Sequence, residues 1–80
     1  MNADFTIDCL GLYCPMPIIK TAEKIKELSV GQILEVISDD PGFLEDIPNW
    51  CKMTGHEFIE MKQDDDEYRA FIRKVGVQFF

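Results

Sequence analysis

The spacing of hydrophobic positions divides this chain into six predicted elements, in the order strand, helix, strand, helix, strand and strand. Over residues 4–9, apolar Phe5, Ile7 and Cys9 alternate with polar side chains, which is the period of a half-buried strand. Residues 32–38 are rich in Ile, Leu and Val, which is typical of a strand in the interior of a sheet. Cys9 is therefore expected in the core, and the alternative is that it is a redox partner for Cys14.

Alternation returns over residues 56–63 and 67–75, and the aspartates at 64–66 between them predict a hairpin. The three aspartates lack the ligand spacing and the terminal glutamate of a calcium loop, so we interpret them as a solvated turn. Beyond the last strand, Phe79 and Phe80 end a short apolar tail that either packs on the sheet or is free for self-association.

Helical spacing begins directly after a pair of prolines. Pro17 suits the first helical position, and Gly31 closes the region. From Ile18 onward the apolar residues recur three or four positions apart and predict one buried face. These residues are Ile18, Ile19, Ala22, Ile25 and Leu28.

A second helix is predicted over about residues 47–53, because Pro48 interrupts an apolar pattern that starts at Phe43. We expect Asp46 to cap its N-terminus, Pro48 to lie in its first turn, and Gly55 to end it.

The composition bounds the class of protein. Eighty residues, 46% of them hydrophobic and 29% charged, predict one domain that covers residues 1–80. The formal net charge of -7 works against binding to nucleic acid or to anionic membranes, so we expect neither as a partner. An acidic surface suits proteins that present Lys and Arg, and it also keeps a small protein soluble.

Three cysteines, Cys9, Cys14 and Cys51, leave one thiol unpaired under any pairing, so free thiols are expected. The first residues lack the basic start and apolar run of a signal peptide, and no stretch has membrane-spanning length. The sequence therefore predicts a cytoplasmic protein.

Cys14 is the candidate for chemistry. Pro15 favours an extended conformation at Cys14, which places this thiol just outside the helix start. Unpaired backbone N–H groups and the positive end of the helix dipole favour a thiolate there and predict a lowered pKa. The alternative is that Cys14 is an inert, small, buried residue.

The segment over residues 8–17 reads DCLGLYCPMP and resembles the Asp-x-x-Gly-x-x-Cys-Pro-x-Pro signature of the TusA/SirA/YedF family of small sulfur-carrier proteins. The segments at 38–41, 46–51 and 55–57 resemble later landmarks of that family, in the same order. The resemblance covers nearly the whole chain.

The resemblance implies an α/β (α+β) two-layer sandwich of order β-α-β-α-β-β, with two helices on one face of a four-stranded mixed sheet. It also implies that Cys14 carries a persulfide, supplied by a cysteine desulfurase-like or rhodanese-like protein donor. The sulfur then passes to an acceptor protein in tRNA thiolation, cofactor synthesis or sulfur oxidation. No cofactor or metal is implied, and donor, acceptor and oligomeric state are left open.

Gly11 is expected to permit the turn before the thiol, with Pro15 and Pro17 as supporting residues. Three further side chains are expected to line the approach to the thiol and to offer a rim for a partner, the alternative being ordinary packing. They are Leu12, Tyr13 and Met16. Asp39 and Asp40 are interpreted as turn and cap residues.

Other thiol chemistries fit the residues less well. Cys9, Cys14, Cys51 and His56 lack the tight spacing of structural zinc ligands, and Pro17 stands where a Cys-x-x-Cys redox site needs its second thiol. Hydrolysis would need His56 to reach Cys14, whereas a histidine at the start of a strand is more often structural.

A persulfide is preserved only where no second thiol can attack its inner sulfur. The carrier hypothesis therefore requires Cys9 and Cys51 to point away from Cys14. Two alternatives remain: a regulatory or adaptor module in which Cys14 is structural, and a relative that handles selenium in place of sulfur. Whether the chain acts as an enzyme or only with partner enzymes is left open.

Overall fold

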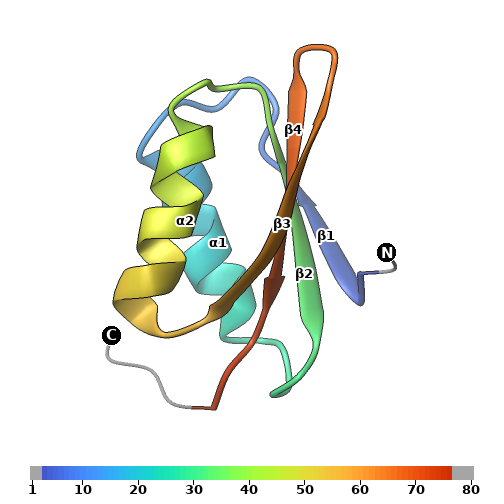
Figure 1. Ribbon diagram of the computed structural model, residues 1–80, viewed down its shortest axis with the longest axis vertical. Coiled ribbons are helices and arrows are strands. Elements are labelled where there is room, and N and C mark those ends of the chain that lie inside the picture. Colours follow the sequence, from blue (N-terminus) through green and yellow to red (C-terminus); the bar gives the residue numbers. More distant parts are fainter. Residues whose placement is uncertain (1–2, 77–80) are drawn as a thin grey trace.

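The computed structural model describes residues 3–76 and contains the six expected elements in the expected order. Figure 1 shows both helices on the same side of the sheet. The elements are β1 (Phe5–Asp8), α1 (Met16–Ile25), β2 (Ile33–Ser38), α2 (Phe43–Thr54), β3 (Glu57–Asp64) and β4 (Glu67–Arg73).

The four strands form one mixed sheet in the order β1-β2-β4-β3. β2 pairs in parallel with β1 and antiparallel with β4, and β4 pairs antiparallel with β3. β2 is thus interior, as its Ile, Leu and Val content predicted, and alternate residues Leu34 and Val36 are fully buried. The predicted two-layer α/β fold is confirmed.

The core lies between the helices and the inner strands. Cys9, Leu34, Val36, Ile47 and Ile72 have no exposed surface, which confirms the prediction that Cys9 is a core residue. Burial of apolar side chains is the main favourable contribution to the free energy of folding of a domain of this size.

The first helix differs from its predicted form at both ends. α1 begins at Met16, so that Pro17 is its second residue, and it ends at Ile25 rather than near Gly31. Its buried face consists of Pro17, Thr21 and Ile25, while Ile19, which we had placed on the apolar face, is 44% exposed. Thr21 is accommodated in the core because its hydroxyl donates to the Pro17 carbonyl at 2.7 Å.

The prediction for the second helix was wrong in its start. α2 begins at Phe43, not at Ile47, and Pro48 lies inside it. Phe43 and Ile47 are one helical turn apart and almost fully buried, and this burial outweighs the backbone hydrogen bond that Pro48 cannot donate. Asp46 is therefore not a cap but a residue of the first turn, and Gly55 ends the helix in the left-handed conformation at φ 89°.

The predicted hairpin is present. Asp64 pairs with Glu67, and Asp65 turns the chain with a positive φ of 53°. The apolar tail with Phe79 and Phe80 lies outside the described residues. Among residues 3–76, no helix has the length and apolar character needed to span a membrane.

Candidate functional site

Cys14 lies in the loop that joins β1 to α1, and its side chain is exposed. The loop leaves the sheet at Cys9, whose N–H donates to the Ile37 carbonyl at 2.7 Å. It then turns at Gly11, which has φ 79°, a conformation that costs glycine little. The Cys14–Pro15 peptide bond is cis. The position predicted for Cys14, just before the helix, is therefore correct.

Two carboxylates from the turn between β2 and α2 hold this loop in place. Asp39 accepts a hydrogen bond from the Gly11 N–H at 3.0 Å, and Asp40 accepts one from the Cys14 N–H at 3.0 Å. Asp40 also accepts from the N–H of Gly42 at 3.2 Å, which is the turn role predicted for it. This turn has a second role that was not predicted from the sequence, which is to anchor the backbone of the cysteine loop.

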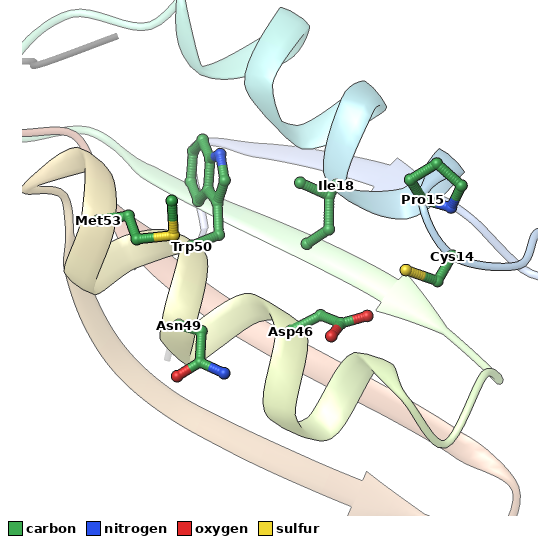
Figure 2. A pocket seen from close by; sticks show the side chains of 7 residues that line it. All are labelled: Cys14, Pro15, Ile18, Asp46, Asn49, Trp50 and Met53. Carbon is green, nitrogen blue, oxygen red and sulfur yellow. The ribbon is translucent and has the colours of Figure 1, made fainter.

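A pocket of about 350 Å³ opens beside the Cys14 sulfur, between the loop and the two helices (Figure 2). Cys14, Pro15 and Ile18 form one wall, from the loop and the start of α1. The opposite wall comes from one face of α2, whose residues follow the spacing of helical neighbours. They are Asp46, Asn49, Trp50 and Met53.

The charge environment of Cys14 overturns one prediction. The pKa of the Cys14 thiol is raised above its usual value, first because the Asp46 carboxylate is placed to accept a hydrogen bond from the neutral thiol. Loss of hydration around the sulfur adds to this rise in pKa, and so does the negative charge of Asp46 and Asp40. Figure 2 shows the Asp46 carboxylate pointing toward the sulfur from α2.

The helix start explains why the predicted lowering of the pKa fails. Pro15 and Pro17 have no N–H, and the N–H of Met16 donates to the Tyr13 carbonyl at 2.8 Å. Few amide donors are left to stabilise a thiolate, because Asp40 also takes the N–H of Cys14. The first turn of α1 indeed contains no acidic residue, but acidic side chains reach the sulfur from α2 and the turn before it.

The other two cysteines belong to the core. Cys9 has no exposed surface and Cys51 is 2% exposed, and all three cysteines are free. Burial raises the pKa of Cys9, and it raises the pKa of Cys51 to about 12. Neither buried thiol is therefore disposed to ionise at neutral pH, whereas Cys14 meets solvent.

The residues predicted for a partner rim occupy different environments. Tyr13 is 73% exposed and Met16 is 40% exposed, so both can meet a partner. Leu12 is partly buried and packs against the core. Met53, at 62% exposed, adds a flexible apolar side chain from α2.

His56 is a structural residue in this fold. It is 5% exposed, its Nδ1 accepts a hydrogen bond from the Val75 N–H at 3.2 Å, and its ring stacks on Trp50 with centroids 5.5 Å apart. Within residues 3–76, no group of three or more His, Cys, Asp or Glu side chains is arranged to hold a metal ion. The four ligands of the zinc alternative are thus not brought together.

The pocket face of α2 was the main element of the site that the sequence analysis missed. Asp46, Asn49, Trp50 and Met53 are spaced as i, i+3, i+4 and i+7, which places them on one side of a helix. The spacing places the four residues on one helical face only if Asp46 itself belongs to the helix. Because the predicted helix began at about residue 47, this shared face was not predicted.

Comparison with known proteins gives a family match over most of the chain. The sequence model of the family described as "Sulfurtransferase TusA" matches residues 5–74. This range contains the cysteine loop, both helices and all four strands.

Curated relatives carry the same kind of description. A Bacillus subtilis protein named "Putative sulfur carrier protein YrkF" is 41% identical over 76 residues, which cover 95% of this chain and 41% of that protein. An Archaeoglobus fulgidus protein named "Putative sulfur carrier protein" is 38% identical over 69 residues, which cover 86% of this chain and 94% of that protein. The chain spans about two fifths of the length of the first relative and nearly all of the second.

Among solved structures, a SirA-like protein from Desulfitobacterium hafniense superposes with a TM-score of 0.77. The match covers 89% of this chain and 97% of that one, at 24% sequence identity. The two proteins share their fold.

Proposed function

This chain belongs to the TusA sulfurtransferase family, and from that premise we propose that it is a sulfur carrier that holds sulfane sulfur as a persulfide on Cys14. The observation that carries the proposal is the contrast among its thiols. Cys14 is exposed at the edge of a pocket, while Cys9 and Cys51 are buried in the core.

Loading is an exchange without net oxidation. The Cys14 sulfur attacks the terminal sulfur of a persulfide on the donor protein, and a new S–S bond forms as the S–S bond of the donor breaks. The donor sulfur leaves with the bonding electron pair and takes up the proton that the Cys14 thiol releases. Delivery repeats the step in reverse, with a nucleophile of the acceptor attacking the terminal sulfur and Cys14 leaving.

The buried cysteines support the stability of such a persulfide. A second thiol beside Cys14 would attack the inner sulfur, close a disulfide and release sulfide. The core position of Cys9 and Cys51, together with the raised pKa of each, disfavours that reaction. The sulfur is therefore kept for a protein acceptor.

The surface around Cys14 supports exchange with protein partners. Tyr13, Met16 and Met53 are exposed and offer apolar contact area, while the charged groups nearest the sulfur, Asp46 and Asp40, are acidic. A donor or acceptor of suitable surface presents apolar residues and at least one Lys or Arg at this place.

The test is intact-mass spectrometry after incubation with a cysteine desulfurase and cysteine. We expect the wild type to gain sulfur that reductant removes, and Cys14→Ser to gain none. Cys51→Ala is the matched control, because it removes a buried thiol and should keep the capacity to load. If folded wild-type protein gains no sulfur from several donors, an adaptor role with a structural Cys14 replaces the carrier role.

A further inference from the structure

Asp46 is held opposite the Cys14 sulfur by the way α2 packs. Its neighbour Ile47 has no exposed surface, and Phe43, one turn earlier, is 1% exposed. These anchors fix the rotation of the helix about its axis and present Asp46 to the pocket, where Figure 2 shows its carboxylate directed at the sulfur. The position of Asp46 in the pocket thus follows from the way that α2 packs on the core.

A second carboxylate lies close to the first. A Cβ placed on Gly42 would stand 3.6 Å from the side-chain oxygens of both Asp40 and Asp46, so the two groups flank the same small residue. Among the described residues, the charged groups that act on the Cys14 thiol are these two aspartates, and both are negative.

This arrangement favours one protonation state of the sulfur. A neutral thiol can donate its proton to the Asp46 carboxylate, whereas a thiolate has no proton to donate and faces two negative charges. Since the thiolate is the nucleophile, the free protein holds its exposed cysteine in the less reactive form.

We propose that Asp46 restrains Cys14 as a thiol in the free protein, and that a Lys or Arg side chain of a docked sulfur donor releases it by pairing with Asp46. The inference rests on the proposed function, because it describes how the same cysteine is switched on. Pairing with a cation weakens the carboxylate as a hydrogen-bond acceptor and offsets part of its repulsion of the thiolate. The Cys14 thiol then releases its proton to solvent and attacks the donor persulfide as a thiolate, and the donor sulfur that leaves takes up a proton in turn.

The restraint is advantageous for an exposed thiol. A thiolate reacts with oxidants and small disulfides wherever it meets solvent, and such products would block sulfur loading. Asp46 and Asp40 keep the cysteine in its less reactive thiol form until a partner with a positively charged side chain docks. The net charge of -7 also favours encounter with such a partner.

The first experiment measures the rate of Cys14 alkylation by iodoacetamide against pH in the free protein. We expect Asp46→Asn to move the midpoint of the rate profile to lower pH and to raise the rate near neutral pH by roughly three- to tenfold. Asp46→Glu, which keeps the charge, should stay close to the wild type. Glu45→Gln is the matched control, since it removes one negative charge from the exposed side of the same turn and should leave the profile unchanged.

An unchanged profile in Asp46→Asn would overturn the proposal. A slower rate at every pH would overturn it in favour of a different role, in which Asp46 accepts the thiol proton during attack. This measurement needs no sulfur donor, so its outcome is independent of whether the protein carries persulfide.

The second experiment follows sulfur loading from a cysteine desulfurase by mass. We expect Asp46→Asn to load several-fold more slowly than the wild type, because the donor cation loses its partner, even though the variant alkylates faster. Faster loading together with faster alkylation would overturn the pairing with a donor cation. A wild type that does not load at all, with the alkylation shift present, would refute the proposed function and leave the restraint standing.

Discussion

At the scale of single residues, His56 shows how a buried polar ring connects parts of the fold. It accepts a hydrogen bond from Val75, after the last strand, and stacks on Trp50 of α2 with an interplanar angle of 24°. Burial lowers the pKa of His56 from its usual value near 6.5, and the positive charge of Lys74 lowers it further. The neutral ring is therefore the form that this structure accommodates.

The first prediction concerns stability against pH. Because the folded-state pKa of His56 is lowered, the unfolded chain binds the proton more tightly, and stability rises with pH. The stabilisation of the fold by neutral His56 should be complete above about pH 6.5, and it should decline as the pH falls through that value toward the pKa of His56 in the folded protein. Urea unfolding followed by circular dichroism between about pH 5.5 and 7.5 measures it.

The control is His56→Asn, which keeps a hydrogen-bond acceptor but does not titrate. We expect this variant to be less stable at neutral pH and to show a flatter dependence over the same range. A wild type that becomes more stable on acidification would contradict the assignment of a neutral His56.

At the scale of elements, α2 uses its two faces for different tasks. Phe43, Ile47, Cys51 and Thr54 are buried against the sheet, whereas Asp46, Asn49, Trp50 and Met53 line the pocket. One helix thus connects core packing to the surroundings of the Cys14 sulfur. A change that rotates or shortens α2 should affect stability and thiol reactivity together.

We predict that Phe43→Ala lowers the free energy of unfolding by about 3–5 kcal/mol. The substitution removes a ring that is 1% exposed at the start of α2 and leaves a cavity in the core. Thermal and urea unfolding measure the loss. Met53→Ala, on the exposed side of the same helix, should change stability by no more than about 0.5 kcal/mol. Equal losses in the two variants would show that Phe43 does not anchor the helix.

At the scale of the whole molecule, negative charge is concentrated in a small volume. The protein carries a formal net charge of -7 within principal extents of 33 × 24 × 17 Å. The ion pairs among residues 3–76, such as Arg69 with Glu35 at 3.1 Å, are partly exposed and contribute little each. Net repulsion therefore opposes the compact state.

Added salt should accordingly stabilise the fold. The Debye length of about 10 Å at 0.1 M is shorter than the molecule, so repulsion between distant carboxylates is screened. We expect the free energy of unfolding to rise by up to about 1 kcal/mol between about 10 mM and 200 mM NaCl, as measured by urea titration at constant pH. A fall over this range would mean that the ion pairs outweigh the net charge.

The sequence predicted the order of the elements, the interior position of β2 and the core position of Cys9, because these follow from local spacing. It also singled out Cys14 as the candidate for chemistry, just before the start of a helix. The start of α2 could not be predicted from local rules, since the cost of Pro48 is overcome only by the burial of Phe43 in the assembled core.

The electrostatics of the site depended on packing in the same way. The first turn of α1, which follows Cys14 in the sequence, contains no acidic residue. The carboxylates that act on the Cys14 thiol belong to Asp40 and Asp46, which come after β2. Contacts between segments so far apart along the chain arise from the tertiary fold. The segment around Asp46 was part of the resemblance to the family, but the position of Asp46 beside the Cys14 thiol was not predicted.

Trp50 is the single tryptophan of the chain, and it lies between His56 and the pocket beside Cys14. The protein therefore contains an intrinsic fluorophore at this site. Its emission should be quenched when the stacked imidazole becomes charged, and it should shift in wavelength when a bound group displaces water from the pocket. Occupancy of the site can thus be followed optically, without a label, in the unmodified protein.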